Sequence, residues 1–283
     1  KKFVAFFFIA LLGFGMVACG GETPECPTCQ EPVCETPETP EVPASYSYGI
    51  AYGLVHGHYV GIAEVTIGKD NKIVSAKLEE VYLPYNMGQI NAAESGVDVE
   101  NLPADVVLVK GRNLANNYYA RYFSVNGVLY EIEVIGPDTA QQSFKYKTAA
   151  GVDIEEWVTN PVNAKAYVDA VLGGTAFRAN ADGTKSAYTA GNASVRISPF
   201  KTTSSYWPAS ATVALGWHGN MKAIIDAVIG TTVGLDADDL TVTEVSGKNY
   251  WTVGDLVTGA TLSDFTDYYV LIQAAYANAL ANR

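Results

Sequence analysis

The chain has 283 residues, with 18 lysines and arginines against 30 aspartates and glutamates, which gives a formal net charge of −12 at pH 7. A surface of this sign repels nucleic acid, so proteins that bind DNA or RNA through basic patches are excluded. All four cysteines lie at or before Cys34, so the rest of the chain has neither a disulfide nor a thiol nucleophile.

Residues 1–18 have the pattern of a secretory signal peptide. Two lysines precede an apolar run that ends in small residues before Cys19, and the run is too short for a permanent membrane span, which needs about 20 apolar residues. Its end resembles a bacterial lipobox, in which the cysteine is lipidated, although Met16 replaces the usual leucine. We expect lipid at Cys19 to hold the protein on the outer face of the bacterial cell membrane. The alternative is an ordinary cleaved signal and a stray cysteine.

Residues 19–45 are rich in proline, glutamate and threonine, which predicts a disordered linker that is lipid-anchored at its first residue. Cys26, Cys29 and Cys34 lie within it. A c-type haem site is excluded because Gln30 stands where that motif needs histidine, and zinc would need a fourth ligand. A tether with an incidental or local disulfide is the simpler interpretation, and a redox or metal role is the alternative.

Beyond the linker, the sequence predicts an α+β fold of antiparallel β-sheets with packed helices. Residues 59–67 and 72–83 are strand candidates on either side of a polar turn. The dipeptide Asn126-Gly127 separates strand candidates 118–125 and 128–135 and is the strongest hairpin signal in the chain.

A local repeat occurs in the second half of the chain. Residues 163–174 read NAKAYVDAVLGG and residues 220–231 read NMKAIIDAVIGT. The spacing of their apolar residues predicts two helices, the first entered through Asn160 and Pro161. The copies indicate either an internal duplication or two related half-domains.

Residues 255–261 read DLVTGAT and resemble the Asp-x-x-Ser/Thr-Gly-Ala-Ser/Thr signature of the FMN-binding domain family. In that family the last residue receives FMN through a phosphoester bond, made by a flavin transferase with FAD as donor and magnesium as helper. The resemblance implies that residues 46–283 are an FMN-binding-like region containing the helical repeat. It also implies a cofactor site made of Thr261, which carries covalent FMN, with Asp255, Thr258, Gly259 and Ala260. Gly259 and Ala260 are small enough for the backbone to enter the transferase cleft.

Apolar residues at helical spacing from Phe265 to Ala279 predict a terminal amphipathic helix. We expect Ser263 to cap its first turn, so that free amides and the helix dipole stabilise a phosphate on Thr261. The alternative is that Thr261 belongs to an ordinary polar turn before a helix.

His56 and His58 are two residues apart and would face the same side of a strand, as in a metal pair. No carboxylate or thiol pattern completes such a site, so we expect no metal there, and a surface or flavin-lining role is as reasonable. Several aromatic residues are candidates for stacking on a flavin ring, although aromatics usually belong to the core: Trp207, Trp217, Trp251, Tyr118, Tyr119 and Tyr122.

A covalently held cofactor cannot be lost by diffusion. The family resemblance implies an extracytoplasmic electron carrier that receives electrons from a membrane NADH or quinol oxidoreductase and passes them to extracellular acceptors. No constellation of acid, base and nucleophile indicates a self-contained enzyme. Two alternatives stay open: the flavin subunit of an extracellular reductase, and a flavin-free ligand-binding lipoprotein.

Overall fold

The computed structural model describes residues 45–210 and 215–283, which belong to one compact unit. The expectations for residues 1–18, for Cys19 and for the other cysteines of the linker lie outside this part of the chain. Within it, no helix combines the length and the apolar character that crossing a membrane requires.

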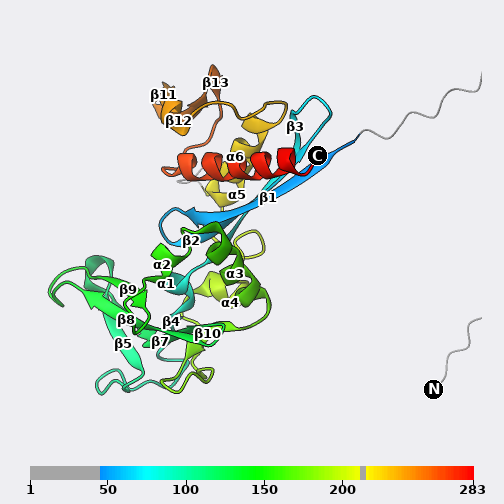
Figure 1. The fold of residues 1–283 in the computed structure, drawn as a ribbon. Coiled ribbons are helices and arrows are strands. Elements are labelled where there is room, and N and C mark those ends of the chain that lie inside the picture. The colour runs from blue at the N-terminus through cyan, green and yellow to red at the C-terminus, as the bar shows by residue number, and fades with distance from the viewer. Residues whose placement is uncertain (1–44, 211–214) are drawn as a thin grey trace, which may run out of the picture. The chain divides into compact units, whose positions relative to one another are not determined.

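Three antiparallel strands form the central sheet: β1 (Ser47–Val55), β2 (Tyr59–Ile67) and β3 (Ile73–Tyr82), in the order β1-β2-β3. The strands expected over 59–67 and 72–83 are confirmed, and Asn71 takes the positive φ of their turn at 64°. The terminal helix α6 (Phe265–Ala281) packs against β1 and β2, as Figure 1 shows in red and blue.

Helix α6 comes very close to β1 at Gly49. A Cβ atom at this position would overlap the carbonyl oxygen of Ala275 and would lie 2.9 Å from the Cα of Ala279. Ala275 and Ala279 are fully buried, so the distance between the helix and the sheet is set by residues without bulky side chains on both elements. The predicted apolar stripe of the terminal helix is confirmed by these contacts.

Two further antiparallel sheets follow in the chain. One has the order β4-β6-β5, with β4 (Gln89–Ile90), β6 (Asn116–Ala120) and β5 (Val106–Lys110). The other has the order β10-β7-β8-β9, with β10 (Ala176–Ala179), β7 (Tyr122–Val125), β8 (Val128–Ile135) and β9 (Ser143–Lys147). The hairpin at Asn126 and Gly127 is confirmed, with φ values of 50° and 81°.

The single strand expected over 118–125 is wrong. The chain divides at Arg121 into β6 and β7, because the two halves pair with different partners: β6 with β4 and β5, and β7 with β8 and β10. At the division, the Arg121 N–H donates to the carbonyl of Asp105 at 2.7 Å.

The two copies of the repeat form α3 (Pro161–Leu172) and α5 (Gly216–Val228), which confirms the helical prediction. Tyr167 and Ile224 occupy equivalent positions and are both fully buried. The Asn160 side chain caps α3 by accepting from Val162 N–H at 2.9 Å. Strand β10 follows α3, whereas the 3-10 helix η2 (Ala237–Asp239) and β11 (Thr241–Val245) follow α5, so the similarity does not extend beyond the helices.

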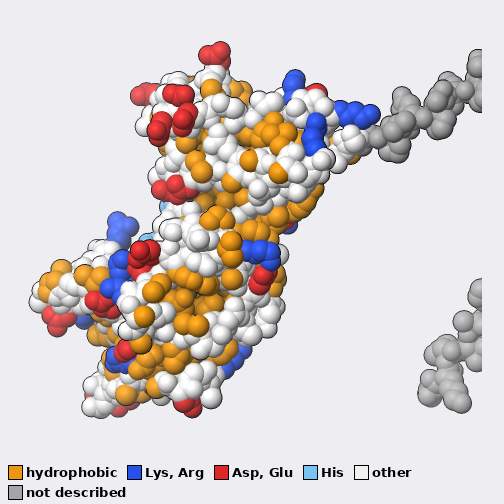
Figure 2. Space-filling view, viewed as in Figure 1, with side chains coloured by type: hydrophobic (Ala, Val, Ile, Leu, Met, Phe, Trp, Pro, Cys, Tyr) orange, Lys and Arg blue, Asp and Glu red, His pale blue; other side chains and the backbone are white. Residues whose placement is uncertain are grey.

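A small sheet precedes α6, in the order β11-β12-β13, with β12 (Lys248–Val253) and β13 (Leu256–Val257). Figure 2 shows acidic side chains gathered over this region. Its exposed acidic residues are Asp236, Asp238, Asp239, Glu244 and Asp255. The remaining short helices are α1 (Pro84–Met87), η1 (Arg112–Leu114), α2 (Ile154–Trp157) and α4 (Ala193–Ile197). Helices packed against antiparallel sheets confirm the predicted α+β fold.

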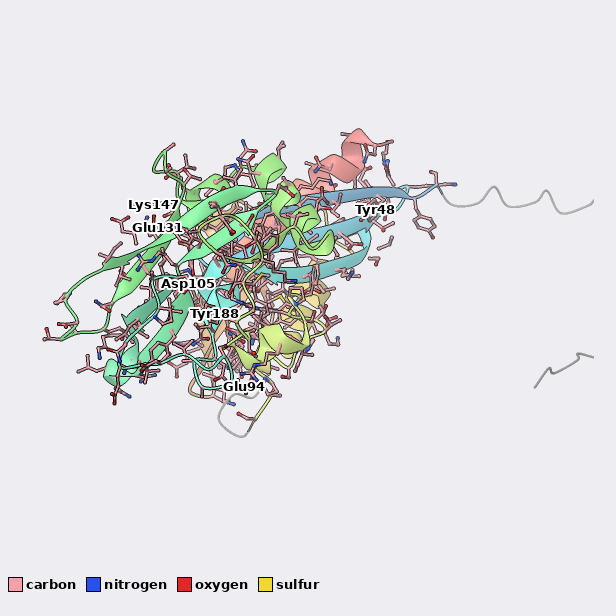
Figure 3. The ribbon with its side chains drawn as sticks, turned by 90° about the horizontal axis from the view of Figure 1, so that it is seen from below. Tyr48, Glu94, Asp105, Glu131, Lys147 and Tyr188 are labelled. Atoms are coloured by element: carbon pink, nitrogen blue, oxygen red, sulfur yellow. The ribbon has the colours of Figure 1, made fainter. Side chains whose placement is uncertain are left out.

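Side-chain contacts fix the loops that surround the β4-β6-β5 sheet. The Tyr188 hydroxyl donates to Asp105 Oδ1 at 2.9 Å, and Arg196 forms an ion pair with Glu94 at 2.9 Å. Figure 3 shows Asp105 next to Tyr188, with Glu94 nearer the lower edge of the view. These contacts join segments that are far apart in the sequence.

The Gly49→Ala substitution is expected to lower the free energy of unfolding by roughly 1–3 kcal/mol or more, because the new methyl group would overlap helix backbone that cannot rotate away. Gly53→Ala is the matched control, since the Cβ there would meet only the flexible Leu271 side chain, at 3.4 Å. Urea unfolding of both variants measures the difference. Equal losses of stability would contradict the close approach of α6 to β1.

Candidate functional site

Thr258 organises the loop that follows β13. Its hydroxyl donates to the Trp251 carbonyl at 2.9 Å and accepts from Ala260 N–H at 3.1 Å. The backbones of the same residues are also paired: Thr258 N–H donates to the Trp251 carbonyl at 2.9 Å, and Trp251 N–H donates to the Ala260 carbonyl at 3.0 Å. The threonine of the motif therefore clamps residues 258–260 onto β12.

The other motif residues have distinct positions in this loop. Gly259 has a φ of 80°, in the left-handed region that favours glycine. Ala260 is fully buried, so its small side chain packs inside this protein. Asp255 is exposed in the two-residue turn between β12 and β13.

Thr261 is exposed, and its backbone N–H is hydrogen-bonded to the side chain of Asn220 in α5. Thr261 N–H donates to Asn220 Oδ1 at 2.8 Å, and Thr261 Oγ1 lies 3.4 Å from the same oxygen. Asn220 is fully buried, and its Nδ2 donates to the Gly216 carbonyl at 2.7 Å. The residue predicted to be modified is thus exposed, and its peptide is held by a buried side chain.

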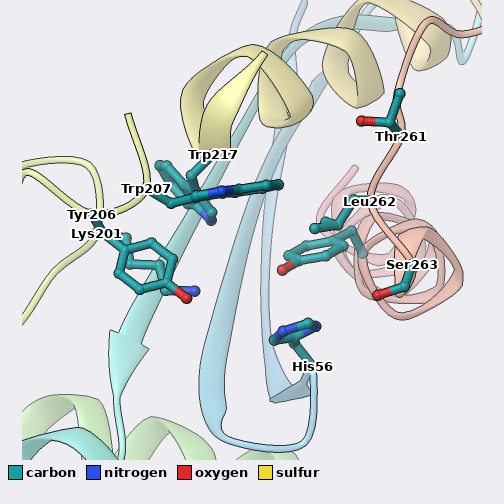
Figure 4. A pocket seen from close by; sticks show the side chains of 9 residues that line it. His56, Lys201, Tyr206, Trp207, Trp217, Thr261, Leu262 and Ser263 are labelled. Atoms are coloured by element: carbon teal, nitrogen blue, oxygen red, sulfur yellow. The ribbon is translucent and has the colours of Figure 1, made fainter. Parts of the chain in front are cut away.

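Thr261 borders a cavity of about 570 Å³, a size within the range of small-molecule sites. The β1–β2 turn, α5, α6 and the segment around residue 206 supply its walls, which Figure 4 shows at close range. The lining residues are His56, Lys201, Tyr206, Trp207, Trp217, Thr261, Leu262, Ser263 and Tyr268. Aromatic walls with a few converging polar groups are typical of sites that bind ring systems.

A buried ion pair belongs to one wall of this cavity, with Lys201 among the lining residues and Glu80 behind them. Glu80 of β3 has no exposed surface, and its carboxylate is paired with the Lys201 ammonium. The Trp217 indole N–H donates to Glu80 Oε1 at 2.8 Å, and the Tyr268 hydroxyl donates to the same oxygen. The carboxylate therefore receives donors from α5 and α6 as well as from Lys201.

Two tyrosine rings enclose the ammonium. Lys201 Nζ lies 3.3 Å from the ring centroid of Tyr59 and 4.1 Å from that of Tyr206, distances at which the cation is attracted by the ring faces. Burial lowers the pKa of Lys201 to about 8, and the neighbouring Glu80 opposes that shift. Burial, and then Glu80, raises the pKa of Tyr268. At neutral pH the lysine is therefore mostly charged and the tyrosine is a neutral donor.

The histidines do not lie on a strand as expected. His56 and His58 belong to the β1–β2 turn, where His56 has a φ of 52°, so the prediction that both face one side of a strand is wrong. His56 is hydrogen-bonded through Nδ1 to Asp264, whereas His58 Nδ1 lies 2.6 Å from Glu155. In residues 45–210 and 215–283, no group of three or more His, Cys, Asp or Glu residues is arranged to hold a metal ion.

The predicted cap of the terminal helix is also wrong. Helix α6 begins at Phe265, and Asp264 occupies the N-cap position, where its side chain makes no capping hydrogen bond. The Ser263 hydroxyl donates to Asp264 Oδ2 at 2.7 Å. Asp267 accepts from His56 N–H at 2.8 Å. Asp264 and Asp267 place two carboxylates at this helix start, and their negative charge opposes the attraction of the helix dipole for a phosphate.

Only some of the aromatic candidates reach the cavity. Trp207 and Trp217 line it. Trp251 lies beside it, where its indole N–H donates to the Leu262 carbonyl at 2.5 Å and its ring stacks on Phe265. Tyr118, Tyr119 and Tyr122 belong to β6 and β7 and do not line the cavity.

Sequence reasoning did not identify Glu80, Lys201 or Tyr206. The available signal was a charged residue directly before an apolar stretch, since Glu80 is followed by Val81, Tyr82 and Leu83. Such a charge needs a buried partner, but periodicity does not show which residue supplies it.

No protein-family model matches this chain, and no curated protein or solved structure matches it. The functional assignment therefore depends on the geometry of the cavity and on the resemblance of residues 255–261.

The Lys201→Met substitution is expected to cost about 3–5 kcal/mol of stability, because it leaves the Glu80 carboxylate buried without its cation. The double variant Glu80→Gln, Lys201→Met should recover most of that loss, since the amide oxygen still accepts from Trp217 and Tyr268. Urea unfolding of the two variants provides the comparison. A double variant as unstable as the single one would show that the lysine acts through packing alone.

Proposed function

We propose that the protein is an extracytoplasmic electron carrier with FMN covalently attached to Thr261. The main support is the position of Thr261: the residue is exposed, it ends the motif of residues 255–261, and it borders an aromatic cavity. A hydroxyl buried in the core would have been out of reach of a modifying enzyme.

The residues of the cavity fit a flavin. Trp207, Trp217 and Tyr206 offer ring surfaces for the isoalloxazine, and Lys201 offers a positive charge. Asn220 fixes the peptide of Thr261, and Thr258 fixes the turn before it. When bound, FMN supplies the capacity to accept and donate one or two electrons.

Attachment requires a partner enzyme, a flavin transferase that uses FAD. Thr261 Oγ1 attacks the phosphorus on the FMN side of the FAD pyrophosphate, a new P–O bond forms as the bond between the two phosphates breaks, and AMP leaves. The hydroxyl proton passes to a base of the transferase. Asp255 lies exposed in the turn between β12 and β13, in a position to be recognised during this step.

The proposed carrier works at the outer face of the bacterial cell membrane, anchored by lipid on Cys19. Its electron donor is a membrane NADH or quinol oxidoreductase, and its acceptors are extracellular. A proline-rich linker allows the flavin domain to move between partners. Covalent attachment keeps the cofactor where free FMN is scarce.

A second candidate function is a flavin-free binding lipoprotein. It is favoured by one observation: the cavity combines aromatic walls with the Lys201 cation, a lining that also suits an aromatic anion held without a covalent bond. Colourless protein from cells that contain an active transferase would support this candidate.

Intact mass spectrometry of protein made with and without the transferase tests the modification. Protein made with the transferase should gain the mass of FMN less one water, and Thr261→Ala should abolish this gain because the acceptor oxygen is lost. Ser263→Ala is the matched control, since that exposed hydroxyl borders the same cavity. An unmodified parent protein, or loss of the modification only in Ser263→Ala, would overturn the assignment of Thr261.

Asp255→Ala should strongly reduce flavin occupancy while changing the free energy of unfolding by no more than about 0.5 kcal/mol, as expected for an exposed surface position. Glu244→Ala is the matched control, because it removes another exposed carboxylate from the same small sheet. The ratio of modified to unmodified protein gives the result. Normal occupancy in Asp255→Ala would remove the aspartate from the recognition signal.

A further inference from the structure

The cavity presents a positive charge on one of its walls. Among the lining residues that belong to the described part of the chain, Lys201 is the only lysine or arginine. Figure 4 shows Lys201 beside Tyr206 on one wall, with Thr261 and Ser263 on the opposite wall. A ring system bound between these walls would therefore meet a cation on the side away from Thr261.

The position of this cation is fixed. Lys201 has 1% of its surface exposed, its ammonium is paired with Glu80, and the rings of Tyr59 and Tyr206 lie against it. An exposed lysine turns its charge into water, whereas this one is held at the cavity by contacts on three sides.

The ion pair has an orientation with respect to the cavity. Lys201, Trp217 and Tyr268 line the cavity, but Glu80 does not. The negative charge of Glu80 lies behind these residues and is stabilised by hydrogen bonds from Trp217 and Tyr268. A ligand in the cavity therefore meets the positive end of the pair.

A buried pair of this kind adds little net stability compared with apolar residues of similar volume, since the cost of removing two charges from water offsets their attraction. Its electrostatic effect on a neighbouring ligand is large, because charges in a site of low dielectric interact more strongly than in water. A flavin ring that has taken up two electrons is an anion at neutral pH, so a nearby cation favours that form.

We infer that Lys201, oriented by Glu80, is the electrostatic residue of the cavity and stabilises the negatively charged, reduced form of the ring bound there. This inference rests on the proposed function for the identity of the ring. By stabilising the reduced form, the Lys201–Glu80 pair raises the reduction potential of the attached flavin.

The test uses the flavin-loaded full chain and the double variant Glu80→Gln, Lys201→Met, which removes the pair without leaving a lone buried charge. Sulfite adds to the oxidised ring and produces an anionic adduct, so its affinity reports on positive charge near the ring. We expect the double variant to bind sulfite at least about tenfold more weakly, measured by loss of the visible flavin absorption, and to have a lower midpoint potential.

Lys222→Met is the matched control, because it removes an exposed lysine of α5 that is not among the cavity residues. It should leave sulfite affinity and potential unchanged. Unchanged values in a flavin-loaded double variant would overturn the role of Lys201 and leave the proposed function intact.

If the parent protein carries no flavin, the proposed function fails, and a pair of aromatic probes tests the lysine separately. Anilinonaphthalene sulfonate is an anion, and phenylnaphthylamine is a neutral molecule with the same ring system. Fluorescence titration should show that the double variant loses affinity for the anion, by about tenfold, but keeps affinity for the neutral probe. Equal changes for both probes would show that no charge is offered to the cavity.

Discussion

The buried carboxylate of Glu80 holds the parts of the site together. It lies on β3 and receives the indole N–H of Trp217, the hydroxyl of Tyr268 and the ammonium of Lys201. These donors come from α5, from α6 and from a segment whose backbone pairs with β3, where Lys201 N–H donates to the Glu80 carbonyl at 2.9 Å. Because an unpaired carboxylate in this position is very costly, the three donors and their elements have to assemble together, and the cavity wall forms as a result.

The motif at residues 255–261 combines two requirements. Thr258 and Ala260 are needed by the fold: one clamps the loop onto β12, and the other fills buried space. Asp255 and Thr261 are exposed and are available to an external enzyme. A short motif can therefore resemble a modification signal partly because the same loop geometry requires some of its residues.

Local signals in the sequence predicted much of the fold. The turn at Asn71, the hairpin at Asn126 and the two repeat helices follow from residues that are neighbours in the chain. The site was less predictable, because Glu80 meets Trp217 and Tyr268 at sequence separations of 137 and 188 residues. The failed predictions also result from contacts between residues that are far apart in the sequence. Ser263 does not cap α6 because the chain reaches the helix through Asp264, whose carboxylate is bonded to His56 from the distant β1–β2 turn.

The hydrogen bond between Asn220 and the Thr261 amide has a mechanical consequence. Asn220 is fully buried in α5, so the Thr261 peptide is attached to a rigid helix rather than to a loose loop. Any group bonded to the Thr261 oxygen turns about the Cα–Cβ and Cβ–O bonds from a stationary pivot. Rotation about these bonds keeps the atoms next to the Thr261 oxygen close to the aromatic walls of the cavity. A larger displacement of the attached group requires movement of the whole domain.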